Sequence, residues 1–137
     1  MHRRGFLQLS TAVVGTTASG AASMPMATLG KSGLRVSRFC LGGYHMAKNG
    51  EENGIRMVRR AVELGVNFFD SAWLYNKGAS DEVYGKALSG GLRKNVLLMG
   101  KAEKRTRAEA FEQLEDTLRR MRTDYLDLWQ CHQVSTM

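Results

Sequence analysis

The sequence predicts an α/β fold built on a parallel sheet, because short apolar runs alternate with helical patterns along the chain. The apolar runs begin 31, 29 and 29 residues apart, at residues 36–41, 67–69, 96–99 and 125–129. Each gap between them holds one amphipathic segment, and a strand–helix–strand unit of about 30 residues connects parallel strands. Three such units can begin either a doubly wound sheet or a (β/α)₈ barrel.

The first 23 residues predict a secretory leader. Arg3 and Arg4 precede an uncharged stretch over residues 11–23 that is rich in Ala, Gly, Ser and Thr. A basic start, an uncharged middle and a small-residue end are the parts of a secretory signal, and the arginine pair resembles the bacterial twin-arginine type. We therefore expect the twin-arginine export machinery as a partner, cleavage among residues 19–23, and an exported protein, periplasmic in a Gram-negative bacterium. The alternative is a basic N-terminus on a cytosolic domain.

A small hairpin and a first helix open residues 24–137. Residues 27–29 and 34–36 flank a turn that contains Gly30 and Gly33, as in a β-hairpin. The first helix is predicted over residues 51–64, with Asn49 and Glu52 as a capping pair and Gly65 as its stop. Its apolar face is expected to comprise Ile55, Val58 and Val62.

Two further helices follow. The second is predicted from a cap at Ser80 to Leu88, and the third begins at Thr106, which has capping-box spacing to Glu109. The buried face of the third helix is expected to comprise Phe111, Leu114, Leu118 and Met121.

Composition and charge exclude several classes of protein. A chain of 137 residues with 43% hydrophobic residues, one proline and two cysteines is neither collagen-like nor a disulfide scaffold. No run approaches the roughly 18 apolar residues of a membrane span, so we expect no stable membrane insertion after cleavage. Loss of the two leader arginines lowers the formal net charge from +7 to +5, and the remaining basic residues are scattered. We therefore expect no nucleic-acid partner and, since the three histidines lack ligand spacing with the cysteines, no metal site.

Titratable side chains follow the apolar runs. Asp70 and Tyr75 come after the second run, Lys101 after the third and His132 after the fourth. Sites in parallel α/β folds collect at the C-terminal ends of strands, so we expect these four side chains to meet. Strand alternation predicts that the opposite face, with Phe69, Leu98, Trp129 and Cys131, packs beneath helices.

These residue types suit proton delivery to a carbonyl oxygen. A phenol is a weak acid, and a nearby ammonium favours its phenolate form and so makes it a better proton donor. A carboxylate would keep Lys101 charged and in place, and His132 could orient the carbonyl oxygen by a hydrogen bond or help to relay the proton. Taken singly, each of these residues is more often structural.

Several ordered motifs resemble the aldo/keto reductase family. Residues 65–75 resemble its signature G-x-N-x-[FL]-D-[TS]-A-x-x-Y, and residues 80–88 resemble its S-E-x-x-x-G-x-x-L helix. Residues 96–101 are similar to its third strand with the catalytic lysine, and residues 124–132 to its fourth strand with a D-x-x-x-x-H ending. The likeness extends from about residue 27 to the last residue.

The resemblance implies the first half of a (β/α)₈ barrel, over residues 24–137. It implies reduction of a small aldehyde or ketone with a nicotinamide cofactor, usually NADPH, with NADH as the alternative. Tyr75 would be the general acid, Lys101 the ammonium that activates it, Asp70 the partner of Lys101 and His132 the group that orients the substrate. The residues near the nicotinamide and its ribose would be Gly43, Tyr44 and Asp70.

Three positions depart from the family pattern. Asn76 stands where glycine commonly follows the tyrosine, Asp81 replaces the usual glutamate, and Gly100 precedes the lysine where threonine or serine is frequent. We expect these changes to affect loop shape and the surroundings of the cofactor rather than the four catalytic roles.

The chain supplies four of the eight strands of such a barrel, which needs about 250 residues. We therefore expect a fragment that carries the catalytic positions, lacks most of the cofactor-binding elements and is inactive alone. The alternative is a non-enzymatic half-barrel that assembles with another half, or a decayed gene product.

Overall fold

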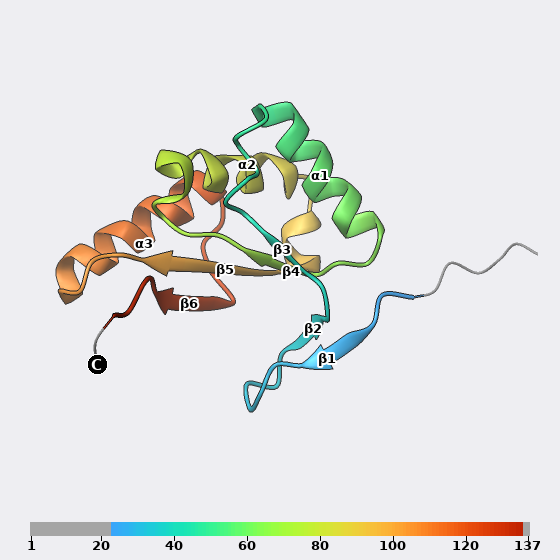
Figure 1. Ribbon diagram of the computed structural model, residues 1–137, viewed down its shortest axis with the longest axis horizontal. Coiled ribbons are helices and arrows are strands. Elements are labelled where there is room, and N and C mark those ends of the chain that lie inside the picture. The colour runs from blue at the N-terminus through green and yellow to red at the C-terminus, as the bar shows by residue number, and fades with distance from the viewer. Residues whose placement is uncertain (1–22, 136–137) are drawn as a thin grey trace, which may run out of the picture.

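The computed structural model describes residues 23–135 (Figure 1). The predicted leader therefore lies outside the described residues, except for its last position. The secondary-structure elements are β1 (Met26–Thr28), β2 (Arg35–Ser37), β3 (Cys40–Gly42), α1 (Glu51–Glu63), β4 (Phe68–Asp70), η1 (Tyr75–Gly78), α2 (Ala79–Ala87), η2 (Leu92–Asn95), β5 (Leu97–Ala102), α3 (Arg107–Met121) and β6 (Leu128–Cys131).

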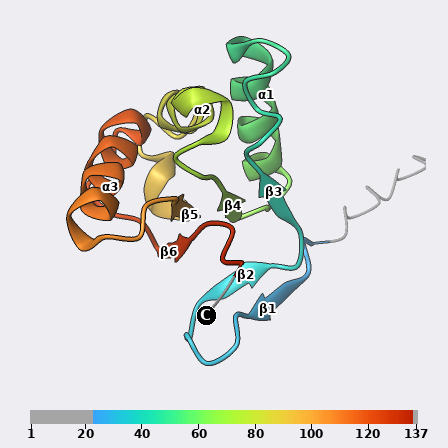
Figure 2. The ribbon, with the colours of Figure 1, turned by 60° about the vertical axis from the view of Figure 1, so that its left-hand side comes forward.

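A four-stranded parallel sheet forms the centre of the fold, in the order β3-β4-β5-β6. The three α-helices cover one face of this sheet, and the β1–β2 hairpin lies away from them (Figures 1 and 2). Strands in sequence order with a helix on the same side of each connection are half of a (β/α)₈ barrel. The register places Gly42 beside Asp70, and Lys101 beside Gln130, so all four strands end at one edge.

The prediction of one strand over residues 36–41 is wrong. Arg35–Ser37 pairs antiparallel with β1, and the parallel sheet begins only at Cys40. Ser37 causes the break, because its hydroxyl donates to the Phe39 carbonyl at 2.6 Å and its backbone N–H donates to Asn67 Oδ1 at 2.7 Å. These bonds bend the chain between the hairpin and the barrel sheet.

The last strand begins three residues later than the sequence predicted. Asp127 occupies the position before it, where its carboxylate accepts from the backbone N–H of Leu98 at 2.9 Å and from Arg93 at 2.8 Å. The exposed Tyr125 ring lies under the Arg93 guanidinium, 3.9 Å from ring centroid to Cζ. The segment before β6 is thus anchored by these side chains together with a backbone bond, from the Asp127 N–H to the Leu98 carbonyl oxygen at 3.0 Å.

The predicted helix caps are confirmed only for α3. Thr106 Oγ1 accepts from the Glu109 backbone N–H. The cap of α1 is Gly50, without a side-chain bond, and the predicted pair of Asn49 with Glu52 is wrong. The cap of α2 is Gly78, while Ser80 lies buried in the first turn.

The core lies between the sheet and the helices. Phe69 and Leu98 are fully buried there, as predicted for this face, together with Val58, Val83 and Tyr84. Helix α3 buries Met121, as predicted, but its other buried residues are Gln113 and Thr117, while Phe111 is exposed. Polar bonds set this rotation, since Gln113 Oε1 accepts the backbone N–H of Glu103 at 2.8 Å and of Lys104 at 3.1 Å.

An apolar patch remains open beside β6. Phe111 is 46% exposed and Trp129 38% exposed, and their rings meet edge to face at 5.9 Å between centroids. Cys131 is also exposed. The prediction that Trp129 and Cys131 pack beneath helices is wrong, because no helix follows β6 within residues 23–135.

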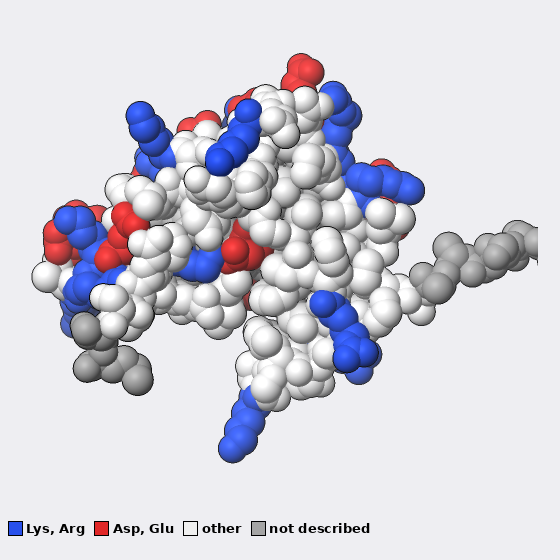
Figure 3. Space-filling model, viewed as in Figure 1, with Lys and Arg blue, Asp and Glu red and all other residues white. Residues whose placement is uncertain are grey.

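The surface carries dispersed charge. Lys and Arg side chains lie over helices, loops and hairpin on the face in view, without a single basic patch (Figure 3). Within the described part of the chain, none of the helices has the length and apolar character to cross a bilayer.

Candidate active site

The four predicted catalytic side chains come together at the C-terminal edge of the sheet. Asp70 is the last residue of β4, and Tyr75 opens the 3-10 turn η1 that follows it. Lys101 lies near the end of β5, and His132 comes directly after β6. The site is therefore assembled from the ends of three neighbouring strands.

The Lys101 ammonium contacts two of the other three side chains of this cluster. Its Nζ donates to the Asp70 carboxylate and to the Ser71 carbonyl oxygen, the latter at 2.9 Å, and lies 3.4 Å from Tyr75 Oη. The Lys101 side chain is only 14% exposed and that of Asp70 21% exposed. A charge-assisted contact in such a shielded place is stronger than one in open solvent. The ammonium is thus fixed beside the phenol.

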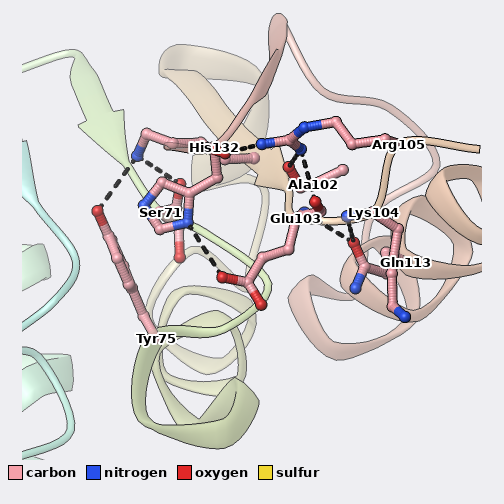
Figure 4. Close-up of polar contacts among 9 residues, drawn as sticks. Ser71, Tyr75, Ala102, Glu103, Lys104, Arg105, Gln113 and His132 are labelled. Carbon is pink, nitrogen blue, oxygen red and sulfur yellow. Dashed lines mark hydrogen bonds and ion pairs between the residues drawn. The ribbon is translucent and has the colours of Figure 1, made fainter. Parts of the chain in front are cut away.

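The Tyr75 ring lies between two other rings. It meets Tyr44 at 5.4 Å and His132 at 5.5 Å between centroids, in both cases edge to face. Aromatic pairs favour this arrangement at such distances. The contacts fix the Tyr75 ring from both sides while its hydroxyl faces Lys101 (Figure 4).

His132 is held mainly through its backbone. Its N–H donates to the Ala102 carbonyl at 2.8 Å, and Arg105 donates to its carbonyl oxygen. Its Nδ1 is buried without a hydrogen-bond partner among the described residues, 3.9 Å from Glu103 Oε1 (Figure 4). That distance is too long for a hydrogen bond. A protonated imidazole would nevertheless pair with this carboxylate.

The predicted cofactor residues lie at the end of β3. Tyr44 is 47% exposed. Gly43 is buried, and a Cβ added to it would lie 2.6 Å from the Asp70 carbonyl oxygen and 3.0 Å from the Tyr84 ring. Close packing of protein against protein therefore requires glycine here.

Sequence reasoning missed a buried network behind the lysine. Asp81 of α2 is fully buried and accepts hydrogen bonds from Ser71 Oγ at 2.5 Å and Thr117 Oγ1 at 3.2 Å. Burial raises the pKa of Asp81 to about 6, although these hydrogen bonds and the nearby Arg120 act to lower it. Asp81 belongs to α2 and Thr117 to α3, and the Ser71 carbonyl accepts a hydrogen bond from Lys101. The network therefore connects both helices to the site. Only the position of Asp81 within the family's helix motif pointed to it.

Sequence reasoning also missed Tyr84. Its ring is fully buried, and its hydroxyl lies 3.0 Å from the Leu41 carbonyl oxygen and 3.2 Å from that of Asp70. Burial raises its pKa well above the ordinary value for tyrosine, so the hydroxyl stays protonated and donates. Tyr84 thereby joins the ends of β3 and β4 beneath the site.

Comparison with known proteins decides the family. The model of the aldo/keto reductase family matches residues 38–136, which include all four clustered side chains. The chain belongs to the aldo/keto reductase family.

Individual aldo/keto reductases agree over the same region. The aldo-keto reductase YhdN of Bacillus subtilis is 30% identical over 125 residues, covering 80% of this chain and 38% of that protein. The holo form of AKR11C1 from Bacillus halodurans superposes with a TM-score of 0.73 at 34% identity, over 80% of this chain and 40% of that one. A Klebsiella pneumoniae aldo-keto reductase in complex with NADPH gives a TM-score of 0.65 at 31% identity, over 77% and 38%. The chain thus spans about two fifths of the length of these relatives.

Two departures from the aldo/keto reductase pattern have structural explanations. Asn76 adopts a left-handed conformation with φ 52°, which glycine adopts freely and asparagine tolerates better than most residues. A Cβ at Gly100 would lie 2.8 Å from Leu126 Cδ1, so the larger residue frequent at this position would collide with this leucine. Both substitutions therefore fit the local packing.

Proposed function

We propose that this chain carries the proton-delivering part of an NAD(P)H-dependent carbonyl reductase, with Tyr75 as its general acid. The position of the Lys101 ammonium supports this proposal most directly. Asp70 and the Ser71 carbonyl hold it 3.4 Å from the Tyr75 hydroxyl. Family membership and the NADPH complex of the Klebsiella pneumoniae relative support the choice of NADPH, with NADH as the alternative.

The chemistry of the donor set fits a nicotinamide cofactor. A phenol, an ammonium and an imidazole can supply a proton and hydrogen bonds, but none of them is a two-electron reductant. When bound, the nicotinamide supplies a hydride to the carbonyl carbon. Asp70, Gly43 and Tyr44 would line its nicotinamide end.

The side chains divide the remaining work. His132 donates a hydrogen bond that orients the carbonyl oxygen, and Tyr75 delivers its proton to that oxygen as negative charge develops there. The Lys101 ammonium stabilises the phenolate that remains. The Asp70 carboxylate accepts from the same Nζ and so directs this ammonium toward Tyr75.

A hybrid barrel tests this assignment. Residues 24–132 of this chain would be joined, after His132, to the portion of the Bacillus halodurans reductase that follows the equivalent strand. We expect this hybrid to oxidise NADPH in the presence of methylglyoxal. We choose this compound because the methylglyoxal reductase YeaE of Escherichia coli is 38% identical to this chain over 80 residues. A folded hybrid that reduces none of a panel of aldehydes and ketones would contradict the proposal.

We also propose that the 137-residue chain alone does not reduce carbonyls, since it spans about two fifths of its relatives. Titration of the purified monomer with NADPH, followed by nucleotide fluorescence, should show no saturable binding in the micromolar range. Micromolar affinity would overturn this part of the proposal.

Export through the twin-arginine machinery is part of the proposal as well. It rests on Arg3, Arg4 and the uncharged stretch after them. A folded fluorescent reporter behind residues 1–30 should reach the periplasm, and replacing both arginines with lysine should stop it. Unchanged export of the double-lysine variant would contradict this assignment.

A second candidate function has one observation in its favour. The exposed pair Phe111 and Trp129 beside the unpaired edge of β6 suits a non-enzymatic half-barrel that assembles with another half. Sedimentation of the chain over a range of concentrations should then show a defined oligomer that Trp129→Lys disrupts.

A further inference from the structure

The loop after the candidate acid has an uncommon conformation. Asn76 and Lys77 both adopt left-handed conformations, with φ 52° and 56°, and Gly78 follows with φ 92°. Left-handed backbone is unfavourable at a residue other than glycine. Two such residues in succession imply that contacts made by this loop hold it in place.

The Asn76 side chain makes those contacts. Its Nδ2 donates to the Tyr44 carbonyl oxygen at 2.6 Å and to Ser80 Oγ at 2.9 Å. Ser80 is fully buried in the first turn of α2, so one acceptor is a fixed point. The other belongs to the exposed turn after β3. The amide thus connects this turn to the body of the fold.

The tethered turn carries a ring that touches the site. Tyr44 is 47% exposed, and its ring meets that of Tyr75 edge to face at 5.4 Å between centroids. The turn itself has few internal bonds, among them Met46 N–H to the Gly43 carbonyl at 3.0 Å and Lys48 N–H to the His45 carbonyl at 3.2 Å. An exposed side chain on such a turn needs an outside contact to hold one position.

We propose that Asn76 is a positioning residue that holds the Tyr44 ring against Tyr75 and thereby fixes one wall of the carbonyl-binding site. The consequence for substrates rests on the proposed function, whereas the tether itself does not. Because the wall is an aromatic face, its loss affects carbonyl compounds with a ring more than small ones. Asn76 is thus a determinant of specificity for ring-bearing carbonyl compounds.

Amide hydrogen exchange on the 137-residue chain tests the tether. In Asn76→Gly, which keeps the left-handed backbone and removes the amide, we expect protection at Met46 and Lys48 to fall about tenfold, as for the loss of one net hydrogen bond. The nuclear Overhauser effect between the Tyr44 and Tyr75 rings should disappear. The control Lys77→Gly changes the neighbouring left-handed residue and should leave both readouts within twofold.

A second variant and a kinetic readout complete the test. Asn76→Asp keeps the shape of the side chain but removes its hydrogen-bond donor, so it should release the turn as Asn76→Gly does. Unchanged amide protection, or an intact contact between the Tyr44 and Tyr75 rings, in either variant would overturn the proposal. In the hybrid barrel, Asn76→Gly should raise the KM for benzaldehyde about three- to tenfold more than it raises the KM for methylglyoxal. An equal change for both substrates would refute the specificity role. A hybrid without activity would instead count against the proposed function, and the exchange data would still test the tether.

Discussion

The buried carboxyl of Asp81 makes the stability of this fold depend on pH. Its pKa lies at about 6 in the folded chain, against an ordinary value of 3.8, because burial disfavours the charged form. The folded state therefore binds the proton more tightly than the unfolded state does. The stabilisation from this group is fully present below about pH 4 and is lost as the pH rises through about 6. The difference between a pKa of about 6 in the folded chain and 3.8 in the unfolded chain corresponds to about 3 kcal/mol in the free energy of unfolding.

Asp81→Asn should remove this dependence. The amide keeps an acceptor for Ser71 and can donate to the Thr117 hydroxyl, so the packing is preserved. Urea unfolding at constant ionic strength gives the free energy of unfolding of both proteins from pH 4 to pH 8. We expect the variant to gain about 2 kcal/mol relative to the parent between pH 4 and pH 7. Glu82→Gln, an exposed neighbour on the same helix, is the matched control.

Taking the difference between variant and parent cancels the titration of all other groups. A difference that stays constant from pH 4 to pH 7 would refute the raised pKa of Asp81. A difference of the opposite sign would show that the folded state favours the carboxylate.

Three further predictions concern the site and its support. Lys101→Met in the hybrid barrel should lower kcat for methylglyoxal about 10²- to 10⁴-fold, because the phenolate loses its ammonium; activity within tenfold of the parent would remove Lys101 from its role. Tyr84→Phe should cost about 1–3 kcal/mol in urea unfolding, since two strand-end carbonyls lose a buried donor; an unchanged midpoint would argue against that bond. Gly85→Ala should destabilise the fold by about 1–3 kcal/mol, because its Cβ would lie 2.4 Å from a backbone oxygen of α3, whereas Gly42→Ala meets open space and should be tolerated; equal thermal midpoints would contradict this packing.

The order of elements followed from the sequence because each strand–helix unit repeats at 29–31 residues. The break between β2 and β3 did not, since it depends on side-chain bonds between Ser37 and Asn67, which are 30 residues apart. Apolar spacing alone predicts that the buried face of α3 comprises Phe111, Leu114, Leu118 and Met121, of which Met121 is buried and Phe111 is exposed. In the structure polar Gln113 and Thr117 face inward, because each has a specific partner that periodicity does not reveal.

The candidate site was predictable as a set of residue types at successive strand ends. Family motifs supplied the roles, and the structure supplied what holds the residues in place. No local pattern marked Tyr84, whose partners belong to other elements. Asp81 and Asn76 were marked only as departures from the family motifs, which did not reveal their partners. Positions that support a site are harder to predict than the site itself, because they depend on the packing of helices against strand ends.

The most direct test of the central claim is Tyr75→Phe in the hybrid barrel, with kcat and the NADPH dissociation constant measured together. Loss of one hydroxyl leaves the ring contacts with Tyr44 and His132 in place. We predict that kcat falls about 10²- to 10⁴-fold while NADPH affinity stays within about twofold. A variant that keeps more than about a tenth of the parent turnover would contradict the role of Tyr75 as the general acid.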